Sequence, residues 1–186
     1  QEVEDPAQLA PTAAGWIVQT LQTRLQEVDR FSLVLSGGST PQALYRQLAN
    51  FPYAAEINWT HLHVFWGDER CVPPDHPQSN YRMACQALLD HVPVPAEHIH
   101  RMRGELPPEE AARAYAQVLD QFFGERQPQF DLVLLGMGAD GHTASLFSHS
   151  AALKETQRWV VANYAPSQAS WRITLTIPAL NAAREI

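Results

Sequence analysis

The stretch FSLVLSGGSTPQALYRQLAN, residues 31–50, decides the fold that we predict for this chain. It opens with an apolar run from Phe31 to Leu35, which is typical of a buried strand. A turn with two glycines follows. Thr40 is a common N-cap residue and Pro41 suits the first helical position, so a helix is expected to begin there and to run to about Asn50.

The rest of the chain repeats this alternation. Hydrophobic spacing predicts further strands at residues 61–66, 99–102, 130–135, 159–163 and 173–177, and further helices at residues 11–29, 80–90 and 107–123. Strands that alternate with helices favour an α/β fold with a mostly parallel sheet and helices on both of its faces. Because no repeat or linker interrupts the pattern, residues 1–186 are expected to form a single domain.

Composition excludes several classes of protein. The 186 residues are 45% hydrophobic and carry a formal net charge of -7, so they can fill a core and are poorly suited to bind nucleic acid or an anionic membrane surface. No apolar run is long enough to cross a bilayer, and the N-terminal residues lack the features of a signal peptide. Two cysteines, Cys71 and Cys85, are too few for a disulfide framework, so we expect a reducing, cytoplasmic location.

Three loops follow predicted strands and hold the conspicuous polar residues. In an open parallel sheet, ligands bind at the carboxyl ends of the strands, which predicts a site where these loops meet. The first loop joins Leu35 to the following helix. Its glycines, the free N–H groups at the helix start and the hydroxyls of Ser39 and Thr40 suit a phosphate, but a tight turn with an ordinary cap fits equally well.

The second loop begins Gly67-Asp68-Glu69-Arg70 and closes at Ser79-Asn80. In one interpretation, Arg70 binds an anion, and the carboxylate of Asp68 or Glu69 orients the arginine. In the other interpretation, these carboxylates and Arg70 form an ion pair on the surface with no ligand, and Asn80 caps the next helix.

The third loop has three glycines around Asp140 and His142. An aspartate near a histidine can orient the ring and raise its basicity, which suits a general base. The alternative is a glycine-rich turn with a surface aspartate. Elsewhere His61 would share a strand face with His63, and His98 with His100, but no third ligand is spaced to complete a metal site.

Four motifs in these loops together resemble the 6-phosphogluconolactonase family. They are SGGSTP at residues 36–41, WGDERCV at 66–72 with Ser79-Asn80, GMGADGHTASLF at 136–147 and RITLT at 172–176. The resemblance covers about residues 10 to 186. It implies a doubly wound, Rossmann-like fold and the hydrolysis of 6-phospho-D-glucono-1,5-lactone to 6-phosphogluconate in the oxidative pentose phosphate pathway.

The resemblance also implies roles for single residues. His142 matches the histidine that activates water, and Asp140 lies beside it in the same motif. The implied substrate- and phosphate-binding residues are Gly37, Gly38, Ser39, Thr40, Asp68, Arg70, Asn80 and Arg172. The implied ligand is a small sugar-phosphate lactone, and no metal or organic cofactor is needed. We expect a monomer.

The chain departs from the family pattern in places. Gln78 stands where an aspartate is frequent, and Ser167 stands where a lysine is common, which would weaken phosphate binding if that lysine contributes. The family pattern further implies a C-terminal strand and helix beyond Ile186, so the domain is expected to lack them.

Two rival functions remain. An amino-sugar phosphate isomerase or deaminase of the same superfamily would carry a glutamate five residues after the motif histidine, where this chain has Phe147. A sugar-phosphate sensor without activity would keep the glycine loop and the arginines but would not need Asp140 or His142.

Overall fold

The computed structural model describes residue 3 and residues 5–124 and 127–186, and it contains a central parallel sheet. The sheet has the strand order β2-β1-β4, with β1 at Phe31–Leu35, β2 at Leu62–Trp66 and β4 at Leu132–Val133. β1 pairs in parallel with both neighbours, from Phe31 opposite Leu62 to Leu35 opposite Trp66 along β2. This arrangement confirms the α/β class, and the first predicted strand has the predicted bounds.

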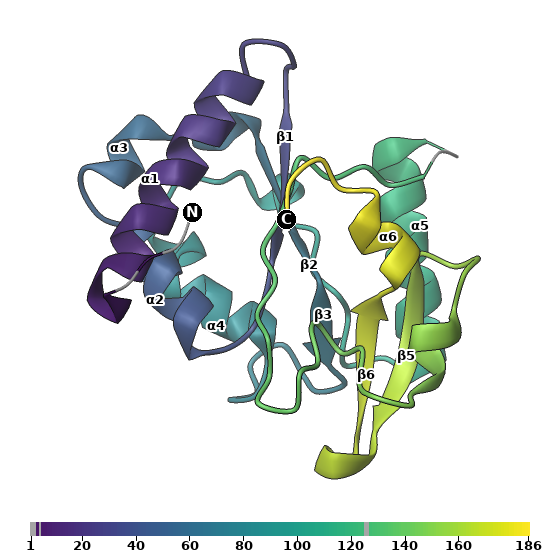
Figure 1. Ribbon diagram of the computed structural model, residues 1–186. Coiled ribbons are helices and arrows are strands. Elements are labelled where there is room, and N and C mark those ends of the chain that lie inside the picture. Colours follow the sequence, from purple (N-terminus) through teal and green to yellow (C-terminus); the bar gives the residue numbers. More distant parts are fainter. Residues whose placement is uncertain (1–2, 4, 125–126) are drawn as a thin grey trace.

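Helices cover the parallel sheet from two sides. α1 (Pro6–Arg24), α2 (Ser39–Leu48), α3 (Tyr53–Glu56) and α4 (Asn80–Ala87) lie together on one side, whereas α5 (Pro108–Phe123) and α6 (Ile177–Asn181) lie on the other (Figure 1). α1 begins earlier than residue 11 because the Asp5 side chain caps it, accepting the Ala7 N–H at 2.9 Å. The helix runs through Pro11 and ends at Arg24, five residues before the predicted end.

Other elements also differ from their predicted bounds: β4 is shorter than the predicted strand at residues 130–135, and 3-10 turns replace the ends of two elements. Residue 61 was predicted to begin a strand, but it ends a 3-10 turn. The helix predicted to run to residue 90 ends at Ala87, and a 3-10 turn follows it. The segment at 99–102 makes a single bridge, from Ile99 to Val64, rather than a strand. The 3-10 turns lie at Trp59–His61, Leu89–His91, Ala96–His98, Ala151–Lys154 and Pro166–Gln168.

A second, antiparallel sheet was not predicted. Its order is β3-β6-β5, with β3 at Asp68–Arg70, β6 at Ser170–Leu175 and β5 at Val160–Ala165. Gly67 joins the two sheets: its N–H donates to Leu35 O at 2.9 Å and its carbonyl accepts the Leu175 N–H at 2.8 Å. The strands predicted near 159 and 173 are therefore real, but they pair with each other and with β3 rather than extending the parallel sheet.

Two buried tyrosines fix the carboxyl ends of β1 and β2. The Tyr45 hydroxyl donates to Ser36 O at 2.8 Å and accepts the Ser36 N–H at 2.9 Å. The Tyr115 hydroxyl accepts the Trp66 N–H at 2.9 Å. Both tyrosines are fully buried, at 0% and 1% exposure. Because a buried backbone group without a partner is costly, these contacts hold the strand ends from which two polar loops start.

A histidine cluster lies along β2. The His63 ring stacks on His98 with centroids 3.8 Å apart, and His63 Nδ1 lies 3.1 Å from His100 Nε2. His61, which was expected to share this face, instead bonds through Nδ1 to Asp29 O. Burial, followed by the charge of the neighbouring histidines and Arg30, lowers the pKa of His63 and of His100 to about 4.

We predict that this cluster makes the fold sensitive to acid. Between the ordinary histidine pKa of about 6.5 and the folded value near 4, the unfolded chain binds more protons than the folded chain, so the free energy of unfolding falls as pH falls. His63→Phe should lose less stability between pH 7 and pH 4.5 than the parent, as measured by urea denaturation. His91→Gln, outside the cluster, should lose as much as the parent. An equal loss in all three proteins would contradict this origin.

Candidate active site

A polar cavity of about 340 Å³ lies where the three loops meet. It is lined by residues from all three loops and from the 3-10 turn before β6, so the loops come together at the carboxyl ends of the parallel strands as the sequence predicts. The lining residues are Ser36, Gly37, Gly38, Ser39, Thr40, Pro41, Asp68, Arg70, Gly136, Met137, Gly138, His142, Ala144 and Gln168.

The N-terminus of α2 forms one wall of this cavity. The N-cap is Gly38, with φ of 111°, and the helix begins at Ser39, so the predicted cap at Thr40 was two residues too late. A positive φ favours glycine at this position. The N–H groups of Ser39 and Thr40 lie in the first helical turn, where they have no acceptor within the helix. They are therefore available to an anion in the cavity.

Asp68, Asn80 and Gly37 are packed against one another beneath this loop. Asn80 Nδ2 donates to Asp68 O at 2.9 Å and to Asp68 Oδ1 at 3.1 Å. A Cβ on Gly37 would overlap the Asn80 amide, so the loop can approach this closely only with glycine at 37. Asn80 is buried and is not a lining residue. It acts on the cavity through Asp68 and Gly37, and the cap of α4 is Ser79 rather than Asn80.

Two arginines face each other across β3 and β6. Arg70 pairs in register with Arg172, and Arg70 lines the cavity. Its guanidinium donates to Gln78 O. Arg172 is 7% exposed, and burial, together with the charge of Arg70, lowers its pKa. It is not a lining residue, but it donates to Oε1 of Gln168, which is one.

His142 reaches the cavity from a tight turn. The Gly138 N–H donates to His142 O at 2.8 Å, the Gly141 N–H donates to Gly138 O at 2.9 Å, and Gly141 has φ of 80°. His142 Nδ1 is hydrogen-bonded to Asp140 Oδ1. This hydrogen bond lowers the pKa of Asp140, whose side chain is exposed. Because Nδ1 is engaged, Nε2 is the ring nitrogen left to act on a ligand.

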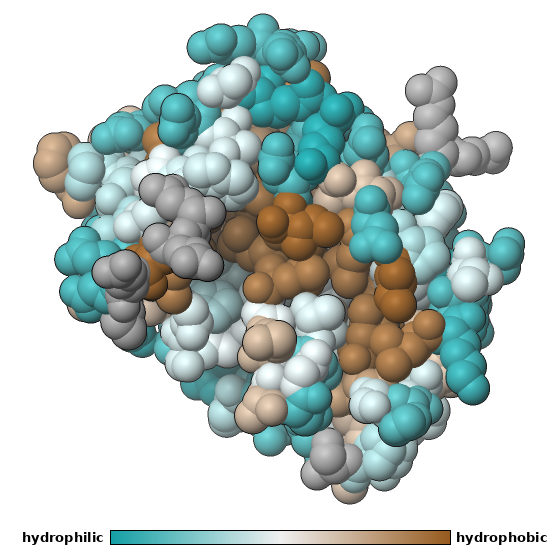
Figure 2. All heavy atoms as spheres, in the orientation of Figure 1, coloured by the Kyte–Doolittle hydropathy of each residue, from teal (hydrophilic) through white to brown (hydrophobic). Residues whose placement is uncertain are grey.

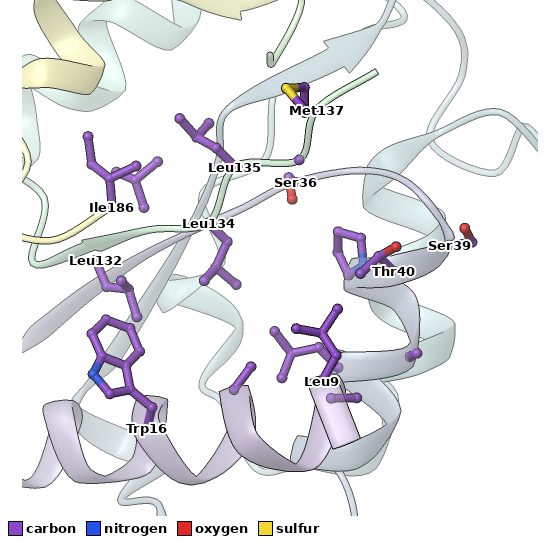
Figure 3. Close-up of a pocket in the computed structure, with 17 residues that line it drawn as sticks. Leu9, Trp16, Ser36, Ser39, Thr40, Leu132, Leu134, Leu135, Met137 and Ile186 are labelled. Atoms are coloured by element: carbon purple, nitrogen blue, oxygen red, sulfur yellow. The ribbon is translucent and has the colours of Figure 1, made fainter. Parts of the chain in front are cut away.

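A larger apolar groove of about 700 Å³ lies beside the polar cavity. Figure 3 shows Leu9 and Trp16 of α1 on one side of it and Leu132, Leu134 and Ile186 facing them. Figure 2 shows hydrophobic residues gathered in the middle of the same face of the molecule. Among its described lining residues none has an acidic, basic or imidazole side chain. We therefore place the chemistry in the smaller cavity, which contains His142, Asp68 and Arg70.

Two residues that the sequence did not single out, Ser145 and Gln168, belong to the site or support it, and Glu69 has a structural role that the sequence did not indicate. Glu69 is 2% exposed and accepts hydrogen bonds from three backbone N–H groups and one hydroxyl. Ser145 donates to Asp68, and Gln168 lines the cavity. Ser145 lies in a quoted motif, but its partner Asp68 is 77 residues away, so no local pattern indicated this contact. The side chain of Ser167 lies outside the part that the structure describes.

Within the described residues, no group of three or more histidine, cysteine, aspartate or glutamate side chains could hold a metal ion. In the same part of the chain, no helix is long and apolar enough to cross a membrane.

Comparison with known proteins gives consistent matches over nearly the whole chain. Residues 4–186 match the family model described as glucosamine-6-phosphate isomerases/6-phosphogluconolactonase. A 6-phosphogluconolactonase of Nostoc sp. is 42% identical, over 98% of this chain and 75% of that protein. One of Treponema pallidum is 38% identical, over 95% of this chain and 74% of that protein.

Solved structures give the same result. The structure titled 6-phosphogluconolactonase from Trypanosoma cruzi has a TM-score of 0.87 and 34% identity, covering 98% of this chain and 76% of that one. A 6-phosphogluconolactonase from Thermotoga maritima has a TM-score of 0.84 and 33% identity, covering 97% and 78%. This chain thus spans about three quarters of the length of these relatives.

The packing of Gly138 against His142 generates a prediction. A Cβ at residue 138 would overlap the His142 ring and approach Asp140 Oδ1 to 2.9 Å. Gly138→Ala should therefore displace the ring and break its bond to Asp140, while the fold persists. The measurement is the NMR chemical shifts of the His142 ring. Gly15→Ala is the control, since its Cβ would meet no atom nearer than 3.9 Å. Unchanged His142 shifts in Gly138→Ala would contradict this packing.

Proposed function

This chain belongs to the glucosamine-6-phosphate isomerase/6-phosphogluconolactonase family, and we propose that it hydrolyses 6-phospho-D-glucono-1,5-lactone to 6-phosphogluconate in the pentose phosphate pathway. The observation that carries the proposal is that His142, hydrogen-bonded to Asp140, lines the same cavity as a free helix N-terminus and Arg70. A base and an anion site within one small cavity suit an ester that bears a phosphate.

In this mechanism the phosphate binds at the N-terminus of α2. The N–H groups of Ser39 and Thr40 donate to it, the glycines at 37 and 38 allow it to approach the backbone, and Arg70 adds a positive charge. Arg172 supports this charge from behind the cavity wall. Because the phosphate is remote from the lactone carbonyl, its binding energy serves to align the carbonyl with the base.

His142 then acts as the general base. Nε2 takes a proton from water as the water oxygen attacks the lactone carbonyl, and a tetrahedral oxyanion forms. Collapse of this intermediate breaks the bond to the ring oxygen, which takes the proton back from Nε2 and becomes a hydroxyl, and the new carboxylic acid then loses its proton to solvent. Asp140 holds Nδ1 protonated and orients the ring throughout. A lactone is an activated ester, so no covalent intermediate and no cofactor are required.

The environment of His142 disfavours the isomerase alternative. Phe147, at the position of the rival's glutamate, is 6% exposed and packs on the imidazole with ring centroids 4.5 Å apart. An apolar ring cannot move protons between substrate carbons. The intact His142–Asp140 pair likewise supports an enzyme over a sensor without activity.

Several finer expectations remain proposals. We propose a monomer, and we propose a cytoplasmic location, which the free thiols of Cys71 and Cys85 support. We also propose that residues 1–186 form a single domain. In its support, the Val133 N–H donates to Glu185 O at 3.0 Å, so Glu185 pairs with β4 of the parallel sheet.

The first functional prediction concerns the base. His142→Ala should lower kcat for the lactone by at least about a hundredfold, the usual scale of general-base catalysis, with an unchanged circular dichroism spectrum. Rates are measured after subtraction of spontaneous lactone hydrolysis. His91→Ala, on the surface, should retain the parent's rate. More than a third of the parent's kcat in His142→Ala would remove this residue from the mechanism.

The second functional prediction concerns the anion site. Arg70→Ala and Arg172→Ala should each raise KM more than they lower kcat, because the phosphate is held equally in the ground and transition states. Competitive inhibition by 6-phosphogluconate should weaken in parallel. Arg113→Ala, on the exposed face of α5, is the control for the change in net charge. If both site variants kept the parent's inhibition constant, the phosphate would have to bind elsewhere.

A further inference from the structure

Ser145 uses all of its polar groups in buried contacts with the antiparallel sheet. It is 1% exposed and follows His142 by three residues. Its N–H donates to Thr174 Oγ1 at 3.2 Å, and its carbonyl accepts from Asn163 Nδ2 at 2.8 Å. Its hydroxyl donates to Asp68 Oδ2 at 2.6 Å. These partners lie on β6, β5 and β3, so one residue joins the His142 loop to every strand of that sheet.

Asp68 is held from both sides by neutral donors. Oδ2 accepts from Ser145 and Oδ1 accepts from Asn80 at 3.1 Å. The described residues include no arginine, lysine or histidine in an ion pair with this carboxylate. A carboxylate offers about four acceptor positions, so capacity remains for a ligand after these two bonds.

The charge of Asp68 indicates which part of a ligand it meets. Asp68 is 8% exposed and lines the polar cavity. A carboxylate repels phosphate, whereas it accepts well from a hydroxyl. In the proposed mechanism the N-terminus of α2 and Arg70 bind the phosphate. Asp68 would therefore contact the sugar hydroxyls.

We propose that Ser145 is a positioning residue that holds the Asp68 carboxylate toward the cavity, where it accepts a hydrogen bond from a sugar hydroxyl of the substrate. The inference rests on the proposed function for the identity of the ligand. Because Ser145 is also part of the His142 loop, it fixes the base and the hydroxyl acceptor relative to each other. The Ser145 hydroxyl touches neither substrate nor reacting atoms and acts through Asp68.

The test separates this role from a merely structural one by comparing two ligands in calorimetry. Ser145→Ala should bind 6-phosphogluconate about tenfold more weakly, the scale of one hydrogen bond to a charged group, and should bind inorganic phosphate within twofold of the parent. Ser150→Ala is the matched control, because the Ser150 hydroxyl is buried without a hydrogen-bond partner in the described structure. It should bind both ligands as the parent does.

Two further variants keep the test decisive. Ser145→Cys keeps a side chain of the same shape but offers only a weak donor, so it should show the same selective loss even if Ser145→Ala folds poorly. In an Asp68→Ala background, Ser145→Ala should weaken 6-phosphogluconate binding by less than twofold, because the carboxylate that Ser145 holds is already absent.

The outcomes distinguish this inference from the proposed function. An equal loss of both ligands in the Ser145 variants, independent effects of Ser145→Ala and Asp68→Ala, or a parent that does not bind 6-phosphogluconate would overturn the inference. A parent that binds 6-phosphogluconate selectively but does not speed lactone hydrolysis would overturn the proposed reaction and leave the positioning role supported by the binding data.

Discussion

The site depends on two neighbouring carboxylates that are buried on opposite faces of one short strand. Because side chains alternate along a strand, Asp68 and Glu69 point away from each other on β3. Glu69 accepts the N–H groups of Arg70, Asn80 and Tyr81 and the hydroxyl of Ser79, which fixes the start of α4 and closes the second loop. Asp68 faces the cavity, held by Asn80 and Ser145. A buried carboxylate is tolerated only with such partners, so this strand ties both loops in place.

The same carboxylates influence the charge balance of the proposed anion site. The net charge of -7 repels a sugar phosphate, so binding requires a local positive field. Arg70 and Arg172 lie opposite each other, and burial beside Arg70 makes the charged state of Arg172 less favourable. The charges of Asp68 and Glu69 act in the opposite direction on Arg172. The two arginines and the two carboxylates thus offset one another in charge, and Arg70 is the arginine of this group that lines the cavity.

Sequence reasoning succeeded where the signal was local. The apolar run of β1, the glycine turn and the start of α2 are contiguous, and the three loops could be placed together because strand ends of a parallel sheet share one edge. It failed where contacts join distant segments. Ser145 lies 77 residues from Asp68, and β3 pairs with β6 across about a hundred residues, so neither local periodicity nor composition reveals them. Glu69 looked like half of a surface ion pair because its burial depends on α4 packing over it.

The glycine loop at residues 36–41 separates the polar cavity from the apolar groove and contributes to the lining of both. Its geometry is set before any ligand arrives: Tyr45 fixes Ser36 at the end of β1, and Asn80 fills the space that a side chain at Gly37 would need. The N–H groups at the start of α2 therefore do not have to reorganise to receive a phosphate. Preorganised donors of this kind are effective because the cost of orienting them is met during folding rather than during binding or reaction. The buried hydrogen bonds of Tyr45 and Asn80 are thus as much a part of the proposed anion site as the N–H groups that would contact the ligand.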